Sequence, residues 1–131
     1  MKTLVITSCC KKKLNHSAPA GQLYLGNLFK AAKKFSERKC YDLMIISAKH
    51  GLVSPSQILE PYDKVLKTKK DIEHIRPNVI ENLKKILPGY DKVIVIAGIK
   101  YRKTIESIID SRFEIITAEG YGKFVKKVNG L

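Results

Sequence analysis

Four short segments of the chain are strongly apolar and rich in β-branched residues. They span residues 3–8, 41–47, 92–97 and 113–117. Apolar runs of this length, bounded by polar residues, predict buried β-strands. The run at 92–97 is almost continuously apolar, which is typical of a central parallel strand that is covered on both faces.

The segments between these runs carry apolar side chains at helical spacing instead. We therefore expect amphipathic helices over residues 22–39, 71–87 and 100–110, and a short terminal helix over residues 123–131. Asp71 is a candidate cap for the second of these helices. Pro77 falls inside the same helix, where it either kinks the axis or marks the true first turn, with residues 70–76 as a separate short turn.

Strands that alternate with helices along a chain predict an α/β fold. We expect a single compact three-layer domain over residues 1–131, with a central, mostly parallel sheet of about four strands between helices. Residues 52–70 contain Pro55 and Pro61 and predict a long irregular loop. Loops of this length in compact domains tend to bind ligands or to cover sites.

The composition is that of an ordinary globular protein. Of the 131 residues, 44% are hydrophobic and 28% are charged, and no apolar run approaches the length of a membrane span. The start of the chain lacks the long apolar region of a signal peptide. We therefore expect a cytoplasmic protein with no membrane partner.

The three cysteines are too few and too unevenly spaced for a disulfide scaffold. Cys9 and Cys10 are adjacent, and neighbouring cysteines rarely bridge because the resulting ring is strained. Cys40 is expected to be a small buried side chain. Paired C-x-x-C spacing is missing, so we expect no metal site, and the sequence leaves the cofactor open.

The chain carries a formal net charge of +13, from 25 Lys and Arg residues against 12 Asp and Glu residues. Such an imbalance is commonly tolerated when the partner is a polyanion. A lysine-rich proteome would also raise the lysine count, but in heat-adapted organisms the acidic residues rise with it. We therefore expect a nucleic acid or nucleotide partner. Because lysine far outnumbers arginine, phosphate attraction is favoured over the reading of bases.

The segment Ser47-Ala48-Lys49-His50-Gly51-Leu52 directly follows the second apolar run. Lys49 and His50 are poor choices inside a buried strand, but they suit its carboxyl end, where open α/β sheets place ligand crevices. Gly51 permits a sharp turn or a close approach to a ligand. An ordinary strand end, with the lysine in solvent and the histidine in a loop, explains the pair about equally well.

Two other predicted strands end in unusual residues, and the carboxyl ends of parallel strands share one edge of a sheet. We therefore expect one crevice for a phosphate or carboxylate at this edge. Its expected residues are Ser8, Cys9, Lys12, Ser47, Lys49, His50, Gly98 and Tyr101, with Tyr62 and Asp63 from the long loop. The segment around Tyr62 either covers the crevice or only builds a turn.

Three side chains of the crevice are candidates for catalysis. Lys49 would neutralise ligand charge or, if buried, act as an amine nucleophile, and His50 would transfer protons. Cys9, or Cys10 beside it, is either a nucleophile activated by His50 or a packed small residue. The chain contains neither a G-x-x-x-x-G-K-[ST] loop nor a G-x-G-x-x-G fingerprint, which disfavours ordinary nucleotide-triphosphate hydrolysis and dinucleotide binding.

A series of short motifs runs along nearly the whole chain: Ser8-Cys9-x-Lys11-Lys12, Leu23-Tyr24 with Phe29, the Ser47–Leu52 segment with Pro55, Pro61-Tyr62-Asp63-x-x-Leu66, Gly98-x-x-Tyr101 and Gly120-x-Gly122-Lys123. With these motifs the chain resembles a family of small prokaryotic and phage α/β proteins that is known mainly as a domain of unknown function. It is distantly similar to the YaaA peroxide-stress proteins, which are linked to DNA binding, and to the lysine-adding domain of archaeosine synthase.

This resemblance implies a site and a class of activity. The implied site residues are Cys9, Lys12, Tyr24, Ser47, Lys49, His50, Tyr62, Asp63 and Gly98. The implied activity is nucleic-acid or nucleobase modification, or a part in stress or phage defence. The chain departs from the family pattern at Cys9-Cys10 and at Asn15-His16-Ser17, where family members tend to be richer in proline.

Two classes of function follow. The first is an enzyme that modifies or transfers groups on a nucleotide, nucleobase or nucleic acid through the Lys49–His50 crevice. The second is a non-catalytic, basic nucleic-acid-binding or stress-response module. Catalysis requires the crevice residues, whereas the binding module requires the peripheral lysines.

Overall fold

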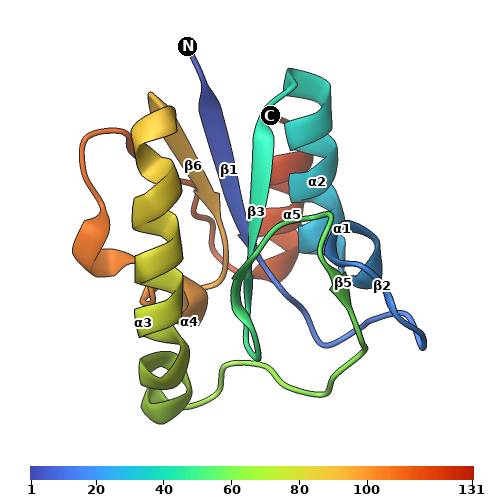
Figure 1. Cartoon of the computed structure of the whole chain (residues 1–131). Coiled ribbons are helices and arrows are strands. Elements are labelled where there is room, and N and C mark those ends of the chain that lie inside the picture. The colour runs from blue at the N-terminus through green and yellow to red at the C-terminus, as the bar shows by residue number, and fades with distance from the viewer.

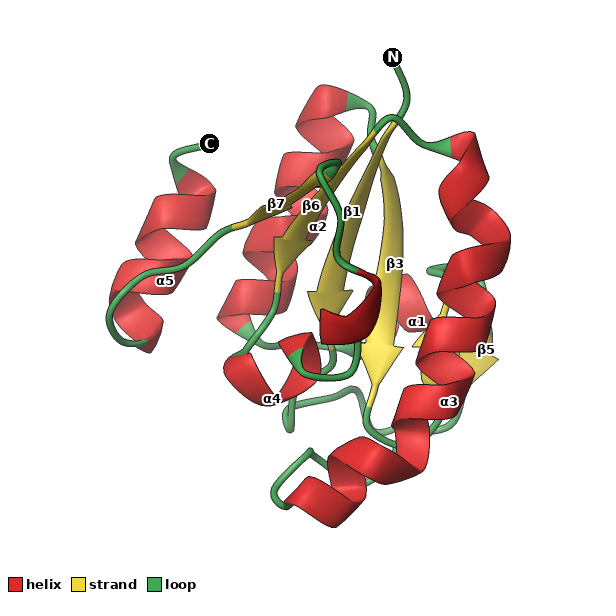
Figure 2. Cartoon of the chain, turned by 90° about the vertical axis from the view of Figure 1, so that its left-hand side faces the viewer, coloured by secondary structure: helices red, strands yellow, loops and turns green.

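The computed structural model describes all of residues 1–131 and is built on a five-stranded sheet with the strand order β4-β3-β1-β6-β7 (Figures 1 and 2). Its strands are β1 (Thr3–Ser8), β3 (Asp42–Ser47), β4 (Gly51–Val53), β6 (Lys92–Ile96) and β7 (Phe113–Ile115). All neighbours pair in parallel except β4, which is antiparallel to β3. The predicted α/β class and mostly parallel sheet are confirmed. The fifth strand, β4, lies at the start of the loop that was expected to be irregular.

Helices cover both faces of the sheet, as predicted, so the molecule has three layers (Figure 1). α3 (Lys69–Ile86) packs on one face, while α2 (Asn27–Lys39) and α5 (Tyr121–Asn129) pack on the other. Side chains of β1 alternate between the two layers, because successive strand residues point to opposite faces. Ile6 joins the core beneath α3, and Val5 joins the core beneath α2.

The helix predicted over residues 22–39 is wrong in its first part. A short helix, α1 (Ala20–Leu23), ends at Tyr24, whose backbone is extended, and α2 begins only after Gly26. The Leu25 amide donates to the Lys12 carbonyl and the Leu23 carbonyl accepts from the Leu14 amide, both at 2.9 Å. These backbone groups pair with the first loop, so they cannot continue a helix.

α3 is one continuous helix of 18 residues with Pro77 inside it. Its cap is Thr68 and not Asp71: the Thr68 side chain accepts from the Asp71 amide, and the Asp71 carboxylate accepts from the Thr68 amide. This reciprocal capping box satisfies two amides of the first turn. Residues 70–76 are therefore not a separate turn, and the axis bends along its length, as expected of an internal proline (Figure 2).

The helix predicted over residues 100–110 is much shorter. α4 (Ile99–Arg102) is a single turn, and a separate 3-10 turn follows at Glu106–Ile108. The Thr104 hydroxyl donates to the Tyr101 carbonyl at 2.6 Å, and the Thr104 amide bonds the same carbonyl. Threonine side chains that compete for backbone carbonyls in this way weaken helices.

The remaining differences are small. β2 (Ala18–Pro19) and β5 (Ile58–Leu59) form a two-stranded ribbon within segments that were expected to be loops. Cys40 is exposed, which corrects its predicted burial, because it lies at the end of α2, where residues 37–39 are exposed as well. No helix of the structure combines the length and the apolar character that crossing a membrane requires.

Candidate functional site

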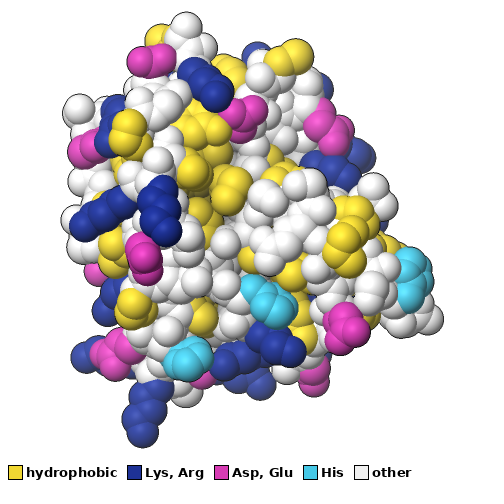
Figure 3. All heavy atoms as spheres, in the orientation of Figure 1, with side chains coloured by type: hydrophobic (Ala, Val, Ile, Leu, Met, Phe, Trp, Pro, Cys, Tyr) yellow, Lys and Arg dark blue, Asp and Glu magenta, His cyan; other side chains and the backbone are white.

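The carboxyl ends of β1, β3 and β6 meet at one edge of the sheet, because the three strands are parallel neighbours. The first loop is attached there by the Cys9 amide, which donates to the Ile46 carbonyl of β3 at 2.9 Å. Lys and Arg side chains, with Asp and Glu among them, gather along the lower part of the molecule (Figure 3), where these strands end in Figure 1.

The Ser47–Leu52 segment is a tight turn that connects β3 to β4. The buried Ser47 hydroxyl accepts from the amides of Lys49 and His50, at 3.3 and 3.1 Å. Gly51 then reverses the chain with φ +77°, a conformation that favours glycine. Ser47 and Gly51 therefore have clear roles in shaping the turn that presents Lys49 and His50.

Three buried or half-buried hydroxyls form a chain behind this turn, which we call the tyrosine network. The Tyr62 hydroxyl is hydrogen-bonded to Ser47 Oγ at 2.7 Å and to the Tyr24 hydroxyl at 2.6 Å. Burial raises the pKa of Tyr24 to about 12 and raises the pKa of Tyr62 still further. Both phenols therefore stay protonated at neutral pH and serve as hydrogen-bonding groups.

Tyr62 also contacts a lysine and an imidazole. Lys13 Nζ lies 4.3 Å from the centroid of the Tyr62 ring, a cation–π distance, and the His50 ring packs edge-on against Tyr62 at 5.4 Å. Burial lowers the pKa of His50 below its usual 6.5, and the nearby Lys49 charge lowers it further. His50 is therefore neutral at pH 7 and can accept a proton.

Cys9 lies at the junction of three elements. Its Sγ accepts from the Ala48 amide at 3.3 Å and lies 3.4 Å from the Tyr101 hydroxyl, which accepts from the Leu66 amide at 3.3 Å. Burial raises the pKa of Tyr101. The hydrogen bonds of Cys9 thus go to a backbone amide and a phenol and not to His50, so the geometry does not favour an activated Cys9–His50 pair.

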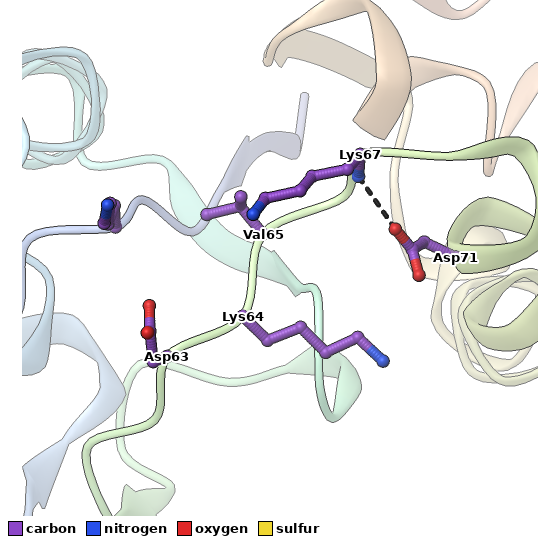
Figure 4. Close-up of a pocket in the computed structure, with 6 residues that line it drawn as sticks. Asp63, Lys64, Val65, Lys67 and Asp71 are labelled. Carbon is purple, nitrogen blue, oxygen red and sulfur yellow. Dashed lines mark hydrogen bonds between the residues drawn. The ribbon is translucent and has the colours of Figure 1, made fainter.

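A second feature of the edge is a cavity of about 270 Å³, which we call the lysine pocket (Figure 4). It is lined by Lys11, Asp63, Lys64, Val65, Lys67 and Asp71. Asp71 accepts from the amides of Thr68 and Lys67, and these bonds lower its pKa. The Asp71 carboxylate is therefore already hydrogen-bonded within the loop and the helix cap. Asp63 is then the only other carboxylate in the pocket, beside three lysines.

A third feature is a cavity of about 200 Å³, which we call the aromatic pocket. It lies between the ends of β1 and β6 and the start of α2 and α5, and is lined by Ser8, Cys9, Cys10, Leu28, Phe29, Gly98, Tyr101, Tyr121 and Phe124. The first loop runs between this pocket and the lysine pocket, since Cys10 lines one and Lys11 the other.

The predicted site residues fall into these three groups, with two exceptions. Ser8, Cys9, Gly98 and Tyr101 line the aromatic pocket, Tyr24, Ser47 and Tyr62 form the tyrosine network with His50 against it, and Asp63 lines the lysine pocket. Lys49 is exposed beside His50. Lys12 is exposed and belongs to none of the groups.

The lysine of the first loop that contacts the tyrosine rings is Lys13, next to the predicted Lys12. Lys13 pairs with Tyr24 in an isolated β-bridge, which directs its side chain towards the tyrosine rings. Neighbouring residues of an extended chain point in opposite directions, so Lys12 faces away. Lys64 and Lys67 were missed as a pair, although their spacing within a long loop beside predicted site residues was a usable signal.

Comparison with known proteins identifies a family and no characterised relative. Residues 4–121 match the model of a family described as a family of unknown function (DUF6884). A search of curated proteins finds no match. The match agrees with the resemblance to an uncharacterised family, while the likeness to the peroxide-stress and archaeosine proteins stays a prediction.

Proposed function

The chain belongs to the DUF6884 family, whose function is unknown, and we propose that it is an enzyme acting on a nucleotide, either free or exposed within a nucleic acid. The observation that carries this proposal is the position of His50. A neutral imidazole lies at the carboxyl edge of a parallel sheet beside Lys49 and contacts the same ring as Lys13.

Binding is assigned to the lysine pocket. Three lysines from two segments of chain surround one cavity, and one of its two carboxylates is already engaged in the cap of α3. Lysine ammonium groups bind phosphates as point charges without demanding a fixed geometry. The net charge of +13 attracts such a ligand over longer distances.

Chemistry is assigned to the turn after β3. His50 would take a proton from the substrate or from water, since a general base must be unprotonated at the working pH. Lys13 and Lys49 would stabilise the negative charge that develops. The tyrosine network would hold His50 in place through the edge-on contact with Tyr62 and the bonds of Ser47 to the turn amides.

The experiment that tests this function is a search for a product. The protein is incubated with ribonucleotides and with single-stranded DNA and RNA oligonucleotides, and each mixture is analysed by mass spectrometry. The proposal expects a change in mass for at least one of these substrates. Binding of a nucleic acid without any change in mass would contradict the proposed enzyme and favour the binding module, for which the net charge is the supporting observation.

Removing the charges of the lysine pocket should weaken binding of a phosphate chain. At about 0.7 kcal/mol for each partly exposed ion pair, the triple variant Lys11→Gln, Lys64→Gln, Lys67→Gln should lose about 2 kcal/mol, or roughly thirtyfold in affinity. The measurement is calorimetric titration with inorganic tripolyphosphate, which carries phosphates and no base.

The matched control removes the same total charge elsewhere. Lys34, Lys39 and Lys84 are exposed, form no ion pair and lie outside the lysine pocket. Their triple glutamine variant should lose less than about threefold, the part that long-range attraction supplies. Equal losses in the two triple variants would show that tripolyphosphate responds only to net charge and has no pocket.

A further inference from the structure

Four aromatic rings and two aliphatic or glycine positions surround the aromatic pocket at the edge of the sheet. The rings belong to Phe29, Tyr101, Tyr121 and Phe124. Tyr121 is 57% exposed and is held in place by its hydroxyl, which accepts from the Leu28 amide at 3.1 Å. An apolar, aromatic-lined cavity beside a cluster of cations suits a ligand with a flat uncharged part and an anionic part.

One polar side chain of this pocket has no partner within the chain. Ser8 is only 7% exposed and lines the cavity, and its hydroxyl forms no hydrogen bond in the structure. Because no bond within the chain occupies it, this hydroxyl is free to bond to a ligand that enters the cavity. A hydroxyl can both donate to and accept from the edge of a heterocycle.

The aromatic pocket and the lysine pocket lie on either side of the first loop. Cys10 and Lys11 are consecutive and line the two cavities. On the other side, the Tyr101 hydroxyl accepts from the Leu66 amide, between Val65 and Lys67 of the lysine pocket. The apolar and the cationic pocket are therefore neighbours, separated by residues 9–11 and by the contact of Tyr101 with Leu66.

We propose that the aromatic pocket binds the nucleobase of the substrate, stacked on its aromatic side chains with Ser8 at the base edge, while the lysine pocket binds the phosphates. This inference rests on the proposed function and adds that the substrate is recognised through an unpaired base. Stacking on aromatic side chains tolerates every base, so the pocket selects nucleotides as a class.

The test compares ligands that differ only in the base. The affinity of the protein for each of AMP, GMP, CMP and UMP is measured by titration and compared with its affinity for ribose 5-phosphate, which lacks a base. At least one nucleotide should bind about tenfold or more tightly than ribose 5-phosphate, the gain expected of one stacked base. Equal affinities would overturn the base pocket and leave the proposed function standing. No binding of any of these ligands would overturn both.

Two variants keep the test specific to the pocket. Gly98 lies at φ −64°, which any residue adopts, and a Cβ there would meet only the Tyr101 ring at 3.8 Å. The leucine side chain of Gly98→Leu should therefore fill the pocket and reduce the affinity for nucleotides to the affinity for ribose 5-phosphate. The affinity for ribose 5-phosphate should not change. Gly122→Leu is the control, since a Cβ at Gly122 meets nothing within 4 Å.

The second variant covers the case in which Gly98→Leu fails to fold. Tyr121→Leu retains an apolar side chain but removes an exposed ring, so it should lose most of the preference for nucleotides over ribose 5-phosphate. Circular dichroism checks that each variant is folded. A folded Tyr121→Leu or Gly98→Leu protein with the full preference would overturn the assignment.

Discussion

Replacing His50 by glutamine should lower turnover of the nucleotide substrate by at least about 100-fold, the usual contribution of a general acid or base. Nucleotide affinity should change by less than about threefold, because the phosphates are assigned to the lysine pocket and the base to the aromatic pocket. The measurement is steady-state turnover and calorimetric affinity on the same preparations. A variant that loses affinity and turnover in equal proportion would show that His50 binds the substrate and does not transfer a proton.

The pH profile provides the second readout for His50. A general base must be neutral, so turnover should fall as the pH drops through the pKa of His50, which burial and the Lys49 charge hold below 6.5. Lys49→Gln removes the second of these causes and should move the acid limb to higher pH. The limb should stay below about pH 6.5, since burial remains. Lys84→Gln, at an exposed position of α3, should leave the limb in place.

Gly51→Ala should destabilise the protein by about 2 kcal/mol. The positive φ costs a residue with a side chain about 1 kcal/mol. A Cβ at this position would overlap with the Asn78 amide oxygen, which accepts from the Leu52 amide at 3.1 Å. Asn78 would have to rotate away, and the lost bond costs about 1 kcal/mol more. Chemical denaturation measures the loss.

A double-mutant cycle separates the two causes. Asn78→Ala should cost about 1 kcal/mol for the same hydrogen bond. The double variant should cost no more than Gly51→Ala, because the bond is lost only once. Gly89→Ala is the control, since a Cβ there meets nothing and its φ is not positive. Simple additivity of Gly51→Ala and Asn78→Ala would contradict the proposed contact.

The sheet could be predicted from the sequence because the residues of each short segment are enough to identify it as a strand. The runs at 3–8 and 92–97 are almost wholly buried on both faces, so most of their positions are apolar or β-branched and the sequence pattern identifies them as strands. The break at Tyr24 could not be predicted, because it depends on backbone bonds to the first loop that only the tertiary structure creates. The apolar residues Leu25 and Leu28 keep helical spacing across that break by coincidence.

The candidate site was likewise predictable in part: its place in the fold could be predicted, and the directions of its loop side chains could not. The edge of the sheet that carries Ser8, Ser47 and Gly98 follows from strand direction, which the order of elements implies. The direction of each loop side chain cannot be inferred from the order of the elements. Lys13 and not Lys12 contacts the tyrosine rings because of its bridge to Tyr24, a pairing of two residues in irregular segments that no periodicity reveals.

If the proposed function is correct, a nucleotide binds at the carboxyl edge of the sheet, across the two pockets and the turn after β3. The most direct test is a titration of isotope-labelled protein with AMP, followed by amide chemical shifts in NMR spectra. We expect saturable changes concentrated in residues 8–13, 47–51, 63–67, 98–101 and 121–124. Changes scattered over the lysines of α2 and the carboxyl half of α3, without saturation, would contradict it.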